Sequence, residues 1–104
     1  MLSVEEIERI KDRIVKFLSP KKIILFGSYA TGTATEDSDL DLVIIADISS
    51  DPRSRNMMVR RLFPGRNFAF DVFVFTPEEE SFKDIKGTIL YSALQRGKVI
   101  YEHK

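Results

Sequence analysis

The sequence predicts an α/β (α+β) domain, on the evidence of its length, its apolar content and the order of its helical and strand patterns. A chain of 104 residues has the length of one compact domain, so we expect residues 1–104 to form a single domain. Hydrophobic residues make up 43% of the chain and charged residues 31%, which suits a packed core under a polar surface. The patterns run helix, strand, loop, strand, helix, strand, helix and short strand, an order typical of a sheet covered by helices.

The N-terminal part predicts a helix followed by a buried strand. Ser3 and Glu6 form a capping-box pattern, and apolar residues then recur every three or four positions until Pro20. The apolar run 23–26 predicts a short buried strand. Segment 27–38 contains two glycines and many small polar residues, so we expect a loop that opens with one helical turn.

The second and third strands mix apolar residues with aspartates. In the second, Leu40, Leu42 and Ile44 share one face. The opposite face carries Asp39, Asp41 and Val43. The third strand, residues 67–75, is almost wholly apolar apart from Asp71. Its four phenylalanines alternate with valine and alanine, so we interpret them as core residues rather than as a surface for stacking bases.

Two further helices begin at proline-containing caps. Asp51 and Pro52 predict the start of a helix that joins the second and third strands and ends by Pro64. We expect its apolar stripe to fill the core with Met57, Met58, Leu62 and Phe63. Thr76 predicts the cap of a last helix that continues to Gly97. Its apolar positions are Phe82, Ile85, Ile89, Ala93 and Leu94, and residues 99–101 predict a final strand.

The composition excludes several classes of site. The chain has no cysteine, which excludes disulfides, thiol catalysis and cysteine-held metals, and its one histidine, His103, lies next to the C-terminus. Any metal must therefore be held mostly by oxygen. No apolar run approaches 18 residues and no signal core precedes the first helix, so we expect a cytoplasmic protein without membrane contact.

Charge is unevenly distributed along a chain whose formal net charge is zero. Residues 23–52 carry six acidic and no basic side chains, whereas residues 53–66 carry five arginines and no acid. Three interpretations of these arginines stay open: a clamp for phosphate or RNA, a surface for a partner protein, or the solvated side of a helix. We favour the solvated side and do not expect direct binding of nucleic acid.

Asp39 and Asp41 are the first candidates for chemistry. Two residues apart on a strand, they lie on the same face. Two such charges about 4 Å apart repel by roughly 4 kcal/mol at an effective dielectric constant near 20, and a divalent cation between them converts repulsion into attraction. Their apolar neighbours predict a central strand, where an unpaired acid is costly.

Asp71 is the third candidate, because a carboxylate in so apolar a strand needs a partner. An arginine of segment 53–66 is one alternative. The other is that its strand lies about 4.8 Å from the strand of Asp39 and Asp41, which would bring three carboxylates to one end of the sheet. Three convergent acids without a local base describe a magnesium site.

Gly27 and Ser28 directly follow the first strand. A glycine there lets the backbone approach a ligand, and Ser28 at a helical turn offers N–H groups and a hydroxyl to a phosphate. A plain turn is the alternative. The segment is not a Walker A loop, because Thr33 stands where that loop has lysine.

The combination of these features resembles the signature of the DNA polymerase beta-like nucleotidyltransferase superfamily. A strand, Gly27-Ser28, ten residues, Asp39-Leu40-Asp41 on a second strand and Asp71 on a third carry the resemblance. The wording LFGSYATG, SDLDLVI, TPEEESF and ALQRGKVIYE resembles the minimal nucleotidyltransferase (MNT) subgroup over essentially the whole chain. The resemblance implies a mixed central β-sheet flanked by helices.

The resemblance also implies roles for these residues. Asp39 and Asp41 would bind two Mg²⁺ ions, Asp71 would act with them on the acceptor hydroxyl, and Gly27 and Ser28 would hold the phosphates of ATP. Many relatives have a basic residue where this chain has Thr31, which removes one contact to the triphosphate.

A biological role follows from the same resemblance. MNT proteins act as antitoxins of HEPN-domain ribonucleases and can transfer AMP to a tyrosine of that toxin, so we expect a hetero-oligomer with a HEPN-domain partner. One alternative is a non-catalytic module that neutralises its partner by binding alone. Another is a catalytic half that needs an accessory chain to modify an antibiotic or an RNA.

Overall fold

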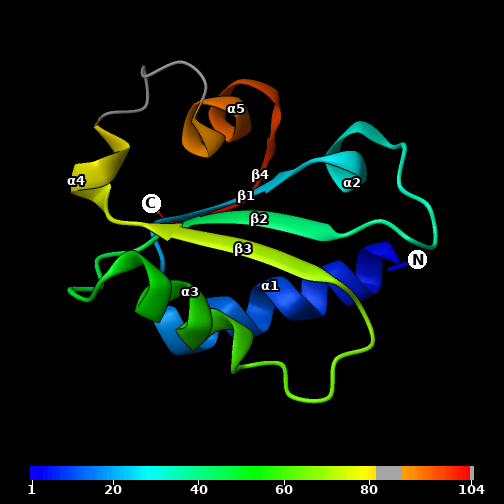
Figure 1. The fold of residues 1–104 in the computed structure, drawn as a ribbon, viewed down its shortest axis with the longest axis horizontal. Helices are drawn as coiled ribbons and strands as arrows, with labels where there is room; N and C mark the ends of the chain where they lie inside the picture. The colour runs from blue at the N-terminus through cyan, green and yellow to red at the C-terminus, as the bar shows by residue number, and fades with distance from the viewer. Residues whose placement is uncertain (82–87, 104) are drawn as a thin grey trace.

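One mixed sheet of four strands, in the order β3-β2-β1-β4, forms the centre of the protein in the computed structural model, which describes residues 1–81 and 88–103 (Figure 1). The strands are β1 (Lys22–Phe26), β2 (Leu40–Ile45), β3 (Phe70–Phe75) and β4 (Lys98–Glu102). β1 pairs antiparallel with β2 and β4, whereas β2 and β3 are parallel. The predicted sheet flanked by helices is confirmed.

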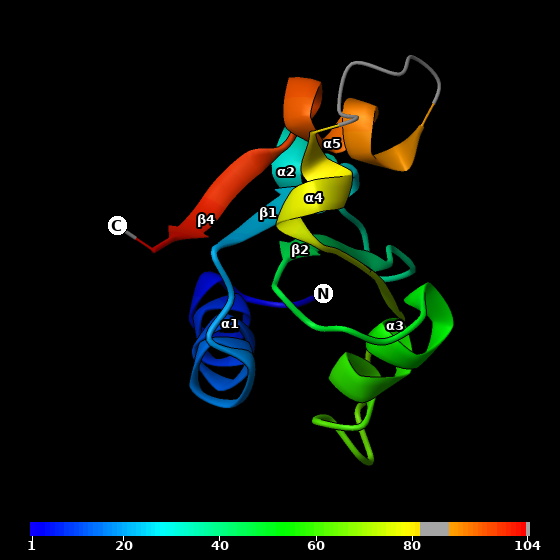
Figure 2. The same cartoon turned by 90° about the vertical axis from the view of Figure 1, so that its left-hand side faces the viewer.

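Helices lie on both faces of this sheet. They are α1 (Val4–Leu18), α2 (Ser28–Thr31), α3 (Pro52–Arg60), α4 (Pro77–Glu80) and α5 (Ile89–Arg96). α1 and α3 cover one face and α5 covers the other, as the two views show (Figures 1 and 2). Within residues 1–81 and 88–103, none of these helices combines the length and the apolar content needed to cross a bilayer.

The first helix forms as its sequence predicts. Ser3 Oγ accepts a hydrogen bond from Glu6 N at 3.1 Å, and Glu6 Oε1 accepts one from Ser3 N at 2.9 Å, so the capping box satisfies two backbone donors. Ile10 and Ile14, four residues apart, are the helix residues buried against the sheet. The helix ends at Ser19, whose φ of 46° lies in the left-handed region.

The alternation in β2 and β3 places their side chains as predicted. Leu40, Leu42 and Ile44 are fully buried on the face covered by α1 and α3. Val43 and Ile45 are buried on the face covered by α5. The crossover through α3 allows β2 and β3 to run parallel, and in the register of this pair residue 41 lies opposite residue 71.

The apolar stripe predicted for the third helix is only partly right. Leu62 and Phe63 pack against the core, but they follow the end of α3 at Arg60. Met57 and Met58 are 37% and 39% exposed, so the prediction that they fill the core is wrong. The helix instead buries Val59 and the side chain of Arg55.

The single last helix predicted from Thr76 to Gly97 is also wrong. The capping box of Thr76 and Glu79 forms, but α4 ends at Glu80. A second helix, α5, begins after Thr88, whose extended backbone (φ −87°, ψ 156°) cannot lie inside a helix. Ile89, Ala93 and Leu94 lie in α5. Phe82 and Ile85 lie outside the described residues. The final strand is confirmed as β4.

Candidate active site

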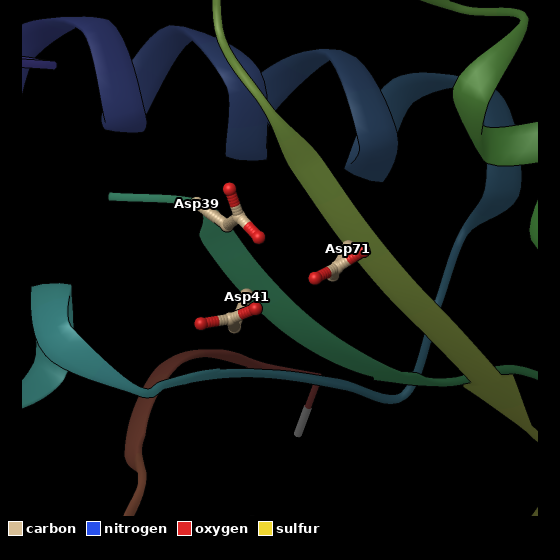
Figure 3. A group of neighbouring side chains, drawn as sticks. All are labelled: Asp39, Asp41 and Asp71. Atoms are coloured by element: carbon tan, nitrogen blue, oxygen red, sulfur yellow. The ribbon is translucent and has the colours of Figure 1, made fainter. Parts of the chain in front are cut away.

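Three carboxylates converge where β2 and β3 begin (Figure 3). Asp41 and Asp71 are register partners on the two parallel strands, and Asp39 lies just before β2. Each of the three contributes an oxygen that lies within 4.8 Å of the oxygens of the other two. The expectation that neighbouring strands bring these acids to one end of the sheet is therefore confirmed as geometry.

The crowding shifts the titration of the central carboxylate. Burial, the negative charges of Asp71 and Asp39 and a hydrogen bond to Asp71, in that order of size, together raise the pKa of Asp41 to about 6. All of these causes penalise the ionised form of Asp41. Negative charge at this spot is therefore a cost to the folded protein that a cation would relieve.

Among residues 1–81 and 88–103, one cationic side chain forms an ion pair with the three acids, and that pair is long and exposed. Of the five arginines that were alternative partners for Asp71, Arg60 is the one that approaches it, with Nη2 4.0 Å from Oδ1. Both side chains are more than a third exposed, so water screens the pair and its contribution is small. Asp71 thus faces the other two acids and has one distant arginine, which combines the two alternatives drawn from the sequence.

Gly27 is required by the geometry of Asp41. Phe26 pairs with Asp41 in the β1–β2 register, so the next residue of the chain passes directly beside that carboxylate. Gly27 has φ +73°, and a Cβ atom added to it would collide with Asp41 Oδ2. The sequence indicated a close approach at this glycine but not that one of the acids is what approaches.

The turn after Gly27 is closed by its own hydrogen bonds. Ala30 N and Thr31 N donate to Gly27 O at 3.1 and 3.2 Å, which forms the single helical turn α2 that the sequence predicted. Thr31 Oγ1 lies 2.9 Å from Thr33 Oγ1 and 3.3 Å from Ser28 O. Thr31 therefore turns its hydroxyl back onto the loop. Ser28 is half-buried on the β1 side of Asp41, away from β3.

Tyr29, the aromatic residue of this turn, has a structural contact. Its hydroxyl accepts a hydrogen bond from Leu2 N at 2.9 Å, and its ring packs against the core. The side chain thereby ties the segment before α1 to the turn that follows β1. The hydroxyl and the ring of Tyr29 are thus both engaged in holding the fold together.

The donor set fits a divalent metal. All three candidate ligands are carboxylates, which are hard oxygen donors of the kind that Mg²⁺ prefers. Their convergence within 4.8 Å and the raised pKa of Asp41 both reflect crowded negative charge that a bound cation would relieve. Asp39, Asp41 and Asp71 are the residues that could hold it.

Comparisons with known proteins bear on what such a site does. The family model described as the nucleotidyltransferase domain matches residues 7–63, just over half of the chain. A protein of Methanocaldococcus jannaschii named "Putative protein adenylyltransferase MJ0604" is 35% identical over 82 residues, which cover 78% of each chain.

Two solved structures share the fold. One, titled as a putative nucleotidyltransferase from Sulfolobus solfataricus, has a TM-score of 0.64 at 18% identity and covers 93% of this chain and 78% of its own. The other, titled as a toxin-antitoxin with AMP-PNP, has a TM-score of 0.65 at 23% identity and covers 93% and 74%. At these identities the likeness establishes the fold.

Proposed function

Because the chain belongs to the nucleotidyltransferase domain family, we propose that this nucleotidyltransferase transfers AMP from ATP to a hydroxyl group of a partner protein. The observation that carries the proposal is the convergence of Asp39, Asp41 and Asp71 within 4.8 Å, beside a glycine that cannot be replaced without displacing Asp41. The name of the relative from Methanocaldococcus jannaschii, a protein adenylyltransferase, supports a protein acceptor.

Each residue of the site has a role in this reaction. Asp39 and Asp41, with Asp71, hold Mg²⁺, which when bound offsets phosphate charge and stabilises the leaving pyrophosphate. Gly27 and Ser28 bind the phosphates of ATP on the β1 side. Asp71 accepts the proton of the acceptor hydroxyl. The hydroxyl oxygen forms a bond to the α-phosphorus while the bond from that phosphorus to pyrophosphate breaks, so no covalent enzyme intermediate is needed.

We further propose that residues 1–104 act as one catalytic domain and that the acceptor is a tyrosine of a HEPN-domain toxin in the same cytoplasmic complex. The chain would then be the antitoxin. A structural neighbour titled as a toxin-antitoxin with AMP-PNP supports this context. The family resemblance of the GSYATG and DLDLVI segments supports the HEPN-domain partner.

The test is transfer of label from α-labelled ATP to the partner in the presence of Mg²⁺. Asp39→Asn should abolish transfer while the circular dichroism spectrum and melting temperature stay those of the wild type, because Asp39 is exposed and buries no core surface. Asp37→Asn, the same change two residues earlier and outside the three-acid group, is the matched control and should transfer normally. Full transfer by Asp39→Asn would contradict the proposal.

One observation favours a second candidate, a non-catalytic antitoxin that neutralises its partner by binding. Thr31 provides no positive charge to a triphosphate, and its hydroxyl is engaged within the loop. The two candidates differ in one result. Inhibition of the partner's activity without transfer of label identifies the binding module, and label on the partner identifies the enzyme.

A further inference from the structure

An arginine-lined groove runs along the exposed side of α3. Its lining residues, which we call the arginine groove, are Arg53, Asn56, Met57, Arg60, Arg61 and Arg66. The groove has a volume of about 630 Å³. The first five recur at intervals of three and four, which is the spacing of one helix face. This face is the open, cationic side of α3, whereas Arg55 and Val59 are the residues that the helix buries.

The charge of the groove is largely uncompensated within the described chain. None of its lining residues is acidic, and among residues 1–81 and 88–103 only Arg60 of its four arginines forms an ion pair, the long contact with Asp71. Arg53, Arg61 and Arg66 are exposed. Four cations that share one surface repel one another, so an anionic occupant would gain more here than at isolated arginines.

The groove leads to the candidate active site. α3 runs antiparallel to β3, because Asn56 contacts Val74 whereas Arg60, one turn later, reaches Asp71. Arg53 and Arg60 are seven residues apart, about 10 Å along the helix axis and the length of roughly three extended residues. The groove thus ends at Asp71 on β3, whereas Gly27 and Ser28 lie on the opposite, β1 side of the acids.

We propose that the arginine groove binds an acidic peptide segment of the acceptor protein and directs the neighbouring hydroxyl toward Asp71. This inference rests on the proposed function, because it assigns the acceptor to the β3 side and ATP to the β1 side. A peptide fits better than RNA for two reasons. Within the described part of the chain, no aromatic ring lines the groove to stack a base, and Met57, 37% exposed, offers an apolar contact between the arginines.

The test compares synthetic peptides with a central tyrosine flanked by three glutamates or three glutamines on each side. With ATP and Mg²⁺, the wild type should have a KM for the glutamate peptide at least tenfold lower than for the glutamine peptide. The combined variant Arg53→Glu, Arg61→Glu and Arg66→Glu should raise the KM for the glutamate peptide at least tenfold while kcat and the dissociation constant of ATP change less than twofold. Arg60 is left intact because it forms the long ion pair with Asp71.

A charge-matched variant controls for net charge. It combines Lys16→Glu, Lys21→Glu and Lys98→Glu, three exposed positions on α1, the following loop and β4. This variant should leave the KM values for both peptides unchanged. The milder substitution of the same three arginines by glutamine should give a KM for the glutamate peptide between those of the wild type and the glutamate variant. A groove variant whose KM for the glutamate peptide equals that of the wild type would overturn the inference.

Binding measured without ATP separates this inference from the proposed function. If the wild type transfers AMP to neither peptide, fluorescence anisotropy with labelled glutamate peptide still decides about the groove. Tenfold weaker binding by the glutamate variant, with no loss in the lysine variant, supports it. Binding of single-stranded RNA that the groove variant loses, with no binding of the acidic peptide, would overturn it.

Discussion

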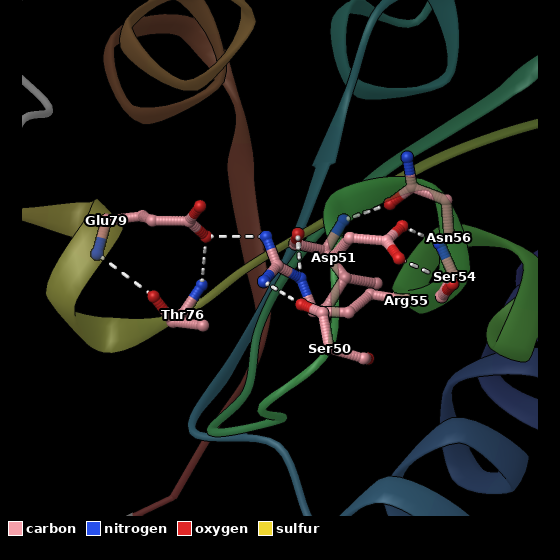
Figure 4. Close-up of polar contacts among 8 residues, drawn as sticks. Ser50, Asp51, Ser54, Arg55, Asn56, Thr76 and Glu79 are labelled. Atoms are coloured by element: carbon pink, nitrogen blue, oxygen red, sulfur yellow. Dashed lines mark hydrogen bonds and ion pairs between the residues drawn. The ribbon is translucent and has the colours of Figure 1, made fainter.

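Charged side chains are paired with one another at one end of the β2–β3 pair and crowded with like charges at the other. At the end where β2 and β3 finish, which we call the far end, Arg55 is only 4% exposed, and each of its three nitrogens donates to an oxygen (Figure 4). Nε donates to Val74 O at 3.2 Å, Nη1 to Ser50 O at 2.7 Å and Nη2 to Glu79 Oε1 at 2.7 Å. At the near end, where β2 and β3 begin, three carboxylates face one another, and among the described residues one arginine pairs with them at 4.0 Å.

The difference is also visible in the acids themselves. Burial raises the pKa of Glu79, but hydrogen bonds from Thr76 and Arg55 outweigh it and hold the value below its ordinary level. At Asp41 burial and the neighbouring charges act in the same direction, upward. The far end therefore satisfies its charges internally and stabilises the fold, while the near end keeps a deficit that a cation can fill.

The far end also closes an open sheet edge. β3 is the edge strand next to α3, and Asn56 Oδ1 accepts a hydrogen bond from Val74 N at 2.8 Å. With Arg55 on Val74 O, two side chains of α3 satisfy both backbone groups of one edge residue. This covers a place where another strand could otherwise add to the sheet.

Asp41→Asn should have the largest effect of the substitutions that test this difference between the two ends. We expect transfer activity to fall at least 1000-fold, about 4 kcal/mol of transition-state stabilisation, because the central one of the three proposed metal ligands loses its charge. The free energy of unfolding at pH 7 should stay equal or rise, because a crowded negative charge disappears. Steady-state transfer assays and urea unfolding measure both quantities. A loss of stability with retained activity would reverse our assignment of this end.

Arg55→Met should produce the opposite result. The substitution leaves Glu79 and two carbonyl groups without their cationic partner, and we expect a loss of about 3 kcal/mol in the free energy of unfolding. Under conditions where the variant is folded, the dissociation constant of Mg·ATP should stay within twofold of the wild-type value. Arg53→Met, on the same helix but exposed, is the control and should change stability little.

Gly27→Ala should cost about 2 kcal/mol of stability, part from the positive φ and part from the collision with Asp41. Gly32 has a similar φ of +78°, but nothing lies within 4 Å of an added Cβ. Gly32 has ψ 15°, in the left-handed helical region, whereas Gly27 has ψ −155°, a conformation open almost only to glycine. Gly27→Ala should therefore lose more stability than Gly32→Ala in urea unfolding, and equal losses would show that neither the backbone of Gly27 nor its contact with Asp41 has energetic weight.

The smallest expected effect is a dependence of the free energy of unfolding on pH that comes from Asp41. The pKa of this acid is higher in the folded protein, about 6, than its ordinary 3.8, so the folded state binds more protons between these values. Stability should therefore fall as pH rises from about 4 to 6 and then level off, by about 1 kcal/mol after solvent screening. Asp41→Asn should lack this fall, which unfolding curves at pH 4.5, 5.5 and 7 can detect.

The site could be predicted from the sequence because its signals are local. The alternation of Asp39 and Asp41 with leucines sets their common face, and the lone Asp71 in an apolar strand marks a charge that needs a partner. The sequence does not show that β2 and β3 pair with each other. It could therefore predict the convergence of the three acids only for the case in which these two strands are neighbours. The contact of Gly27 with Asp41 depends on the β1–β2 register and was not visible.

The errors have physical causes of the same kind. Periodicity assigns arginine to the surface, but Arg55 is buried because Ser50, Val74 and Glu79 happen to meet its three donors. Met57 and Met58 then remain exposed on a helix that packs at the edge of the sheet. Thr88 carried a usable signal, since threonine before an apolar run is a common N-cap.

Calorimetric titration of Mg·ATP tests the central claim most directly. We expect a saturable heat of binding to the wild type that is lost in Asp41→Asn and unchanged in Arg53→Met. A flat titration of the folded wild-type protein, or equal binding by Asp41→Asn, would contradict the claim that the three acids form a cation and nucleotide site.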